Sequence, residues 1–281
     1  RMYDYDKRPL ETKLEAEGDT PNGHWQKVTF TAGYVGPRMA AYLFFPKNAS
    51  PPFEPVIQWG NSGDLLQRQL NPNDPLIDTF SGFILRSGRV LVLPLYMGAY
   101  ERDDSAFSIT RSIPDSTAYY RDVMVEWIKD LRRTVDFLET RQDVRSDRIG
   151  YLGLSWGGET APIALAIETR IRAAVLYSAG YHAIASRAEV AKFNYTPRVR
   201  VPTLMLNGRY DTVFPYETSQ EPFFNQLGTL PHDKKKVVSE TGHVLPMATV
   251  VRETIAWFDH YLSGKPLASV EQPVTAEVRR P

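Results

Sequence analysis

The sequence contains no cysteine. Disulfide bonds, a thiolate nucleophile, and metal or iron–sulfur sites built on cysteine are therefore excluded. The sequence also has no apolar run that approaches the roughly 20 residues needed by a membrane-spanning helix. Its N-terminal segment, RMYDYDKRPLETKLE, lacks the apolar stretch of a secretory signal. We expect a protein without a membrane span, located in the cytoplasm.

The sequence also has no excess of positive or of negative charge. The 33 lysine and arginine residues equal the 33 aspartate and glutamate residues in number, and the largest basic cluster is Lys234, Lys235 and Lys236. Such a sequence offers no extended basic surface for a phosphate backbone. We therefore expect no nucleic-acid partner.

Apolar residues are present in sufficient number for one large core, at 42% of 281 residues. We interpret residues 1–281 as a single domain, with an N-terminal extension at 1–24 and a short insertion at 180–200 that forms a pocket wall. Apolar runs predict strands, and after the first two they alternate with helical patterns. The strands are expected at 25–32, 39–45, 55–59, 89–94, 148–154, 172–179, 202–208 and 234–240, and the helices at 78–87, 116–141, 159–168 and 247–262.

This alternation indicates the class of fold. Strands that alternate with helices, several of them apolar on both faces, are typical of a mostly parallel sheet covered by helices on both sides. Turn residues between the first two runs indicate an antiparallel hairpin at the N-terminal edge. We predict an α/β fold of about eight strands, antiparallel at its N-terminal edge and without a large cap domain.

The strongest local motif is Gly153-Leu154-Ser155-Trp156-Gly157, which stands between an expected strand and an expected helix. A serine at such a turn adopts a strained backbone that exposes its hydroxyl above the sheet, and flanking glycines avoid collisions with neighbouring elements. We therefore predict Ser155 as a nucleophile. The backbone N–H of Trp156, at the helix N-terminus, is an expected oxyanion donor.

A serine nucleophile needs a base and a carboxylate, which follow it in the order Ser, Asp or Glu, His in enzymes with this turn. Asp211 comes after the expected strand 202–208, and His243 comes after the strand 234–240. Loops at the carboxyl ends of parallel strands meet at one edge of the sheet. We predict Asp211 and His243 as the other catalytic residues. His182 is the rival for the base, and we interpret it as a substrate contact.

Other residues near this edge are predicted to bind substrate. The loop after the strand 55–59 begins with Gly60, and the backbone N–H of Asn61 is the expected second oxyanion donor. Arg102 is expected to hold the loop after the strand 89–94 through Glu101, Asp103 or Asp104. The predicted substrate-binding residues are Trp59, Tyr96, Tyr100, Tyr181, His182 and Phe214, whose aromatic character favours an acyl or aryl group over a sugar.

At these residues the chain resembles the α/β-hydrolases of the dienelactone hydrolase and prolyl oligopeptidase branch. It resembles more closely the hydrolase domain at the C-terminal end of some bacterial serine/threonine protein kinases. The similar stretches include SGFILRSGRVLVLPLYMGAYERDD, YRDVMVEWIKDLRRTVDFLETR, GYLGLSWGG, PTLMLNGRYDTVFPYETSQ and TGHVLP. The resemblance implies the α/β-hydrolase fold, the triad Ser155, Asp211 and His243, and a covalent fusion to a kinase domain before Arg1. Many members have His-Gly where this chain has Trp59-Gly60.

The motifs together predict a serine hydrolase that cleaves carboxylic esters through an acyl-enzyme on Ser155, with no metal or organic cofactor. Two alternatives stay open. One is a serine peptidase that acts on short peptides, because a triad does not distinguish an ester from an amide. The other is a regulatory module that has the fold without turnover. The sequence leaves the oligomeric state and the identity of the small-molecule ester open.

Overall fold

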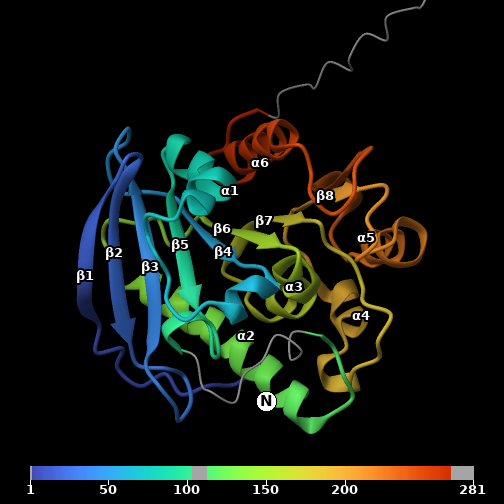
Figure 1. Cartoon of the computed structure of the whole chain (residues 1–281), viewed down its shortest axis with the longest axis horizontal. Helices are drawn as coiled ribbons and strands as arrows, with labels where there is room; N and C mark the ends of the chain where they lie inside the picture. Colours follow the sequence, from blue (N-terminus) through green and yellow to red (C-terminus); the bar gives the residue numbers. More distant parts are fainter. Residues whose placement is uncertain (1, 103–112, 267–281) are drawn as a thin grey trace, which may run out of the picture.

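A nine-stranded sheet runs through residues 2–102 and 113–266, which the computed structural model describes (Figure 1). Its strands lie in the order β1-β2-β3-β5-β4-β6-β7-β8-β9. They are β1 (Lys13–Thr20), β2 (Gly23–Phe30), β3 (Met39–Pro46), β4 (Pro55–Trp59), β5 (Val90–Leu95), β6 (Ile149–Leu154), β7 (Ile171–Tyr177), β8 (Thr203–Gly208) and β9 (Lys234–Ser239).

The sheet has an antiparallel edge and a parallel remainder, as the sequence predicts. Strand β2 pairs antiparallel with β1 and β3, and β3 pairs antiparallel with β5. From β5 onward, through β4 and β6 to β9, every neighbouring pair is parallel. The carboxyl ends of these six strands therefore open on one edge, where residues distant in sequence come together.

Strand β1 is the element that the sequence analysis leaves in the N-terminal extension. Its sequence, KLEAEGDT, is polar, and most of its residues are exposed. It lies at the edge of the sheet and is held by backbone pairing with β2. Its one large apolar residue, Leu14, is 53% exposed, so the segment lacks the apolar pattern of a half-buried strand that would predict it.

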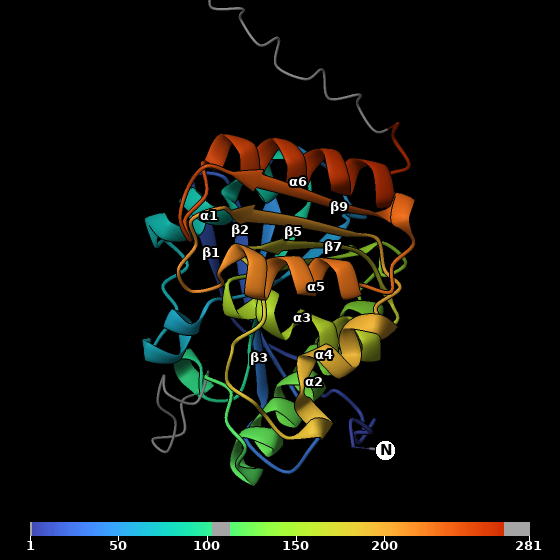
Figure 2. The ribbon, with the colours of Figure 1, turned by 90° about the vertical axis from the view of Figure 1, so that its right-hand side faces the viewer.

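Helices cover both faces of the sheet. Helices α1 (Pro75–Arg86) and α6 (Met247–Tyr261) pack on one face, and α2 (Ala118–Glu139) and α3 (Trp156–Ile167) pack on the other. Figure 2 shows α6 beyond β9 on one side and α3 and α2 on the opposite side. The remaining helical elements are η1 (Ser62–Leu66), η2 (Tyr100–Arg102), η4 (Ala188–Val190), α4 (Lys192–Tyr195), η5 (Thr196–Arg198), η6 (Tyr216–Gln220), α5 (Glu221–Gln226) and η7 (Pro231–Asp233). None of the helices in the described ranges is long and apolar enough to cross a membrane.

Helix α2 forms where its sequence predicts it. Apolar residues at helical spacing bury one side of the helix, and Thr117 caps its N-terminus by accepting a hydrogen bond from the backbone N–H of Tyr120. Helix α3 differs, because ten of its twelve residues are buried. A helix that is buried on all sides has no polar face, so its sequence lacks the amphipathic pattern of a surface helix.

A buried ion pair fixes the loop that follows β5. Arg102 Nη1 lies 2.6 Å from Asp130 Oδ2 on α2, and the two side chains are only 3% and 1% exposed. Arg102 also donates to the carbonyl of Leu95, and Asp130 accepts a hydrogen bond from the backbone N–H of Met97. The described part of the loop is therefore tied to α2 at Met97 and at Arg102. Of the partners predicted for Arg102, Glu101 binds Lys27 and Tyr42 instead. Asp103 and Asp104 lie outside the described residues, and the ion pair that the structure describes is with Asp130.

A second polar cluster fixes the loop that follows β4. Asp64 accepts hydrogen bonds from the hydroxyl groups of Tyr96, at 3.2 Å, and Tyr100, at 3.0 Å. A Cβ at Gly60 would lie 1.6 Å from Asp64 Oδ2, so only glycine fits beside this carboxylate. Burial raises the pKa of Asp64 to about 6, although the two tyrosine hydroxyls and the Asn61 N–H oppose the shift.

Replacing Asp130 with Ala should lower the free energy of unfolding by about 3–5 kcal/mol, because it leaves the buried Arg102 guanidinium without its counter-charge. Urea denaturation of the purified variant measures the change. Asp122→Ala is a matched control on the same helix, since Asp122 is 61% exposed and should cost less than about 1 kcal/mol. Equal losses in the two variants would contradict the role given to the buried pair.

Asp64 should make the protein less stable as the pH rises from about 4 to about 6. Its pKa is about 6 in the folded state against an ordinary 3.8, so the folded state holds the proton more tightly and ionisation favours unfolding. Asp64→Asn removes this dependence. The stability of the wild type relative to the variant should fall by no more than about 3 kcal/mol across this range. Urea denaturation at several pH values measures it, and a constant difference between the two proteins would exclude the shifted pKa.

Candidate active site

The turn between β6 and α3 holds Ser155 in an unusual backbone conformation. Its φ is 52° and its ψ is −106°, a backbone conformation that residues other than glycine rarely adopt. The Ser155 N–H donates to the carbonyl of Tyr177 at 2.8 Å, and the Gly157 N–H donates to the carbonyl of Gly60 at 3.0 Å. A Cβ at Gly157 would lie 2.2 Å from the carbonyl oxygen of Trp59. Gly157 therefore allows the end of β4 and the start of α3 to approach each other closely.

The structure brings Ser155, Asp211 and His243 together. Ser155 Oγ lies 2.8 Å from Nε2 of His243, and Nδ1 of His243 lies 2.8 Å from Oδ2 of Asp211. Asp211 follows β8 and His243 follows β9, so the three residues meet where the carboxyl ends of parallel strands meet. This arrangement is the geometry of a nucleophile, a base and a carboxylate that orients the base.

The environment of Asp211 favours its charged form. Its side chain is 0% exposed, and burial alone works against the charge. Hydrogen bonds from His243 and from the backbone N–H groups of Phe214 and Val213 outweigh burial and hold the pKa of Asp211 below its usual value. Asp211 therefore remains an acceptor for the Nδ1–H of His243 at neutral pH, which leaves Nε2 free to accept a proton.

Two residues at the end of β7 hold the loop that carries His243, and the sequence analysis did not find them. The hydroxyl of Ser178 donates to the carbonyl of His243 at 2.6 Å. The hydroxyl of Tyr177 accepts from the N–H of Leu245 at 3.2 Å. Both side chains bind backbone groups, and a backbone partner leaves no signal in a sequence. The positive φ of Ser178, 52°, is likewise visible only in the structure.

The two predicted oxyanion donors flank the backbone hydrogen bond that joins α3 to the loop after β4. Trp156 is the first residue of α3, next to Gly157, and Asn61 is next to Gly60. The Asn61 side chain accepts from the N–H of Gly63 at 2.7 Å, which shapes this loop. The Asn61 N–H also favours the ionised form of Asp64, so it would serve two acceptors when an oxyanion forms.

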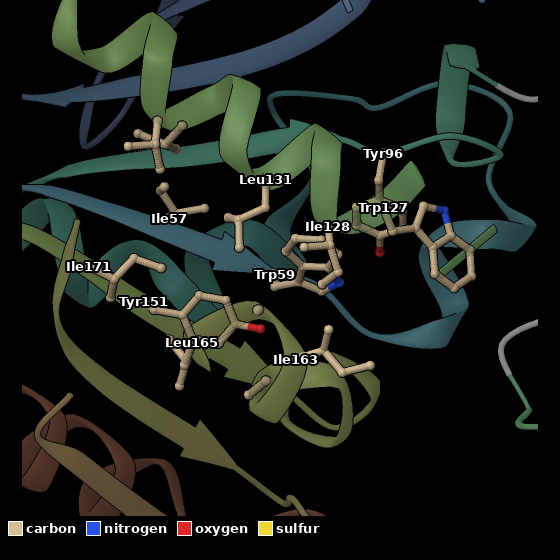
Figure 3. Close-up of a cluster of buried hydrophobic side chains, with 14 of the residues drawn as sticks. Ile57, Trp59, Tyr96, Trp127, Ile128, Leu131, Tyr151, Ile163, Leu165 and Ile171 are labelled. Atoms are coloured by element: carbon tan, nitrogen blue, oxygen red, sulfur yellow. The ribbon is translucent and has the colours of Figure 1, made fainter. Parts of the chain in front are cut away.

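Two of the predicted substrate-binding residues are core residues. Trp59 is 1% exposed and Tyr96 is 2% exposed, and their rings stack with centroids 5.4 Å apart. Figure 3 shows both among the buried side chains of Trp127, Ile128 and Tyr151. The prediction that Trp59 and Tyr96 line the site is wrong, because both rings are buried and pack against the ring of Trp156, the residue after Ser155.

The other predicted substrate-binding residues lie closer to open space. Tyr100, Tyr181 and His182 are partly exposed. Phe214 is buried, at 1% exposure, but its ring lies near the rings of His182 and His243, with centroid distances of 5.0 and 5.9 Å. Their role in binding substrate stays a prediction.

Two cavities flank the site. One, of about 290 Å³, lies on the side of α1 and is lined by residues that include Gly60, Asn61, Asp64, Tyr100 and Leu154. The other, of about 370 Å³, lies on the side of α4 and is lined by residues that include Glu159, Tyr181, His182, Ile184 and Lys192. The described residues contain no group of three or more His, Asp or Glu side chains placed to hold a metal ion.

Solved structures with this fold are numerous and distant in sequence. A cold-adapted esterase from an Arctic intertidal metagenomic library is 17% identical, with a TM-score of 0.66 over 89% of this chain and 99% of that one. Acetyl xylan esterase 1 from Thermoanaerobacterium is 16% identical, with a TM-score of 0.66 over 92% and 90% of the two chains. A putative dienelactone hydrolase from Klebsiella pneumoniae is 19% identical, with a TM-score of 0.63 over 88% and 99%. The shared fold is that of the α/β-hydrolases.

Sequence comparison narrows the family. No curated protein sequence matches the chain significantly. The model of the PET hydrolase-like family, PETase, matches residues 108–266, which is more than half of the chain. The α/β-hydrolase membership that the motifs predict is thus confirmed, whereas the resemblance to kinase-linked hydrolase domains stays a prediction. The chain belongs to the PET hydrolase-like family and is a carboxylic-ester hydrolase of the α/β-hydrolase superfamily.

Proposed function

We propose that this protein hydrolyses carboxylic esters in two steps through an acyl-enzyme on Ser155. The observation that carries the proposal is the continuous set of contacts from Ser155 Oγ through the His243 ring to the Asp211 carboxylate, each 2.8 Å long. Serine is a poor nucleophile at neutral pH unless a base accepts its proton as it attacks. His243 Nε2 lies at the distance that such a transfer requires.

In the first step Ser155 Oγ attacks the carbonyl carbon of the ester while its proton passes to Nε2 of His243. The carbonyl oxygen becomes an oxyanion, and the N–H groups of Trp156 and Asn61 are the proposed donors to it. When the tetrahedral intermediate collapses, the bond from carbon to the alcohol oxygen breaks. His243 then gives its proton to the departing alcohol, and the acyl group stays on Ser155.

In the second step water attacks the acyl-enzyme. His243 takes a proton from the water molecule, and the same N–H groups hold the second oxyanion. Collapse of this intermediate breaks the bond to Ser155 Oγ, which recovers its proton from His243, and releases the carboxylic acid. Asp211 keeps the imidazole in the tautomer that both steps require and stabilises its charged form.

Removing the nucleophile should abolish turnover. Ser155→Ala should lower kcat on a simple aryl ester such as 4-nitrophenyl acetate by at least about a thousandfold, because no other group can form the acyl-enzyme. Absorbance of released 4-nitrophenolate measures the rate. Ser263→Ala is a matched control, since Ser263 follows α6 and binds Glu54 and Arg89, and it should keep the wild-type rate. A Ser155→Ala variant with a tenth or more of the wild-type rate would contradict the assignment.

A further inference from the structure

The cavity on the side of α4 contains a buried ion pair that the triad does not use. Glu159 Oε1 lies 2.8 Å from Lys192 Nζ, and the two side chains are 1% and 5% exposed. Glu159 stands in the first turn of α3, and Lys192 is the first residue of α4. Both line the cavity of about 370 Å³. A pair so well buried is costly to desolvate unless its remaining hydrogen-bonding groups are satisfied.

One oxygen of this pair has no such partner. Glu159 Oε2 is buried and accepts no hydrogen bond from the described residues. Lys192 is better satisfied, because it binds Glu159 and donates a short hydrogen bond to the hydroxyl of Tyr120. A buried carboxylate oxygen without a donor is a costly arrangement, and such a group commonly binds a water molecule or a ligand. Glu159 lines the cavity, and Oε2 is the oxygen of its carboxylate that lacks a donor among the described residues.

The charges around the cavity select the kind of donor. The opposite charges of Glu159 and Lys192 cancel each other. Burial lowers the pKa of His182, which lines the same cavity, so its imidazole is neutral at neutral pH. A cation in this cavity would lose its hydration without meeting a net negative charge. A neutral donor meets no such cost. The neutral imidazole of His182 carries one donor and one acceptor, and Lys192 has a third N–H, so an acceptor on the same ligand can also be satisfied.

The cavity lies close to the proposed nucleophile. The N–H of Glu159 donates to the carbonyl of Ser155 at 2.9 Å, so the two residues are one helical turn apart, about 6 Å along the axis of α3. The ring of Phe214 also lies near both His182, which lines the cavity, and His243. A substrate with its ester carbon at Ser155 could place a group a few bonds away in this cavity.

We propose that the cavity lined by Glu159, His182 and Lys192 is a substrate subsite that binds a hydroxyl group. The hydroxyl donates to Glu159 Oε2 and accepts a hydrogen bond from His182 or Lys192. The preferred substrates are therefore esters that carry a free hydroxyl on the acyl chain or on the alcohol. This inference rests on the proposed ester hydrolysis at Ser155 and specifies its substrate class. It also adds a hydroxyl to the acyl or aryl group that the sequence leads us to expect.

The test compares esters that carry a hydroxyl with their methyl ethers, which lack the O–H donor and carry one additional methyl group. One pair is 2-hydroxyethyl and 2-methoxyethyl benzoate, and the other is 4-nitrophenyl 3-hydroxybutanoate and 3-methoxybutanoate. The methoxy group keeps the oxygen and its inductive effect but cannot donate. The wild type should show a kcat/KM at least about tenfold higher for the hydroxyl member of one pair. A ratio near one in both pairs would overturn the subsite and would indicate that Glu159 Oε2 binds water only.

A double variant then assigns the preference to the ion pair. Glu159→Leu with Lys192→Met removes both buried charges together, which avoids leaving either one alone. The ratio of kcat/KM between hydroxyl and methoxy esters should fall to about one. The control is Glu253→Leu with Lys235→Met, a lysine–glutamate pair of the same 2.8 Å length between α6 and β9, which should keep the wild-type ratio.

The ratio compares two esters on the same protein, so a general loss of activity in the double variant lowers both rates and leaves the ratio unchanged. If the double variant does not fold, the wild-type ratios still decide the proposal. A hydroxyl preference that persists in the folded double variant would overturn the role of Glu159. If the wild type hydrolyses none of the four esters or 4-nitrophenyl acetate, the proposed function fails and the subsite fails with it. Hydrolysis of all the esters without hydroxyl preference contradicts the subsite alone.

Discussion

The strained turn at Ser155 is the constraint on which the rest of the site depends. A positive φ at a serine costs about 1–3 kcal/mol, and it persists only where the surroundings enforce it. Here the Ser155 N–H is bound by the end of β7, and the Gly157 N–H is bound by the end of β4. The two neighbouring strands thus hold the turn from both sides. The Gly157 hydrogen bond also holds the loop that contains Asn61, and the side chains of Tyr177 and Ser178 hold the loop that contains His243.

Buried polar clusters hold the loops around this turn in place. Arg102 and Asp130 tie the loop after β5 to α2, and Asp64 joins the loop after β4 to the tyrosines that follow β5. Glu159 and Lys192 join α3 to α4 on the opposite side. In the first cluster only Arg102 Nε lacks a partner among the described residues, and it is a donor that lines none of the cavities beside the site. The third leaves Glu159 Oε2 unused, which is why we interpret it as a binding group.

The sequence predicts the parts of this molecule that depend on chain order and periodicity. Ser155, Asp211 and His243 could be selected because each follows an expected strand in the order Ser, Asp, His, and the carboxyl ends of parallel strands meet at one edge of the sheet. Trp59 and Tyr96 could not be placed, because an aromatic residue at the end of a strand looks the same whether its ring faces the site or the core. Glu159 carried no signal at all, since an acidic residue in the first turn of a helix is common in any protein. Its burial and its partner on α4 exist only in the folded chain.

The central claim is that Ser155 carries the acyl group, and labelling with a fluorophosphonate tests it most directly. The probe forms a stable adduct with a serine that a base activates, and mass spectrometry of the digested protein identifies the modified residue. We expect one adduct in the folded wild type, on the peptide that contains Ser155, and none after unfolding in urea. An adduct on another residue, or no adduct on folded protein that hydrolyses esters, would contradict it.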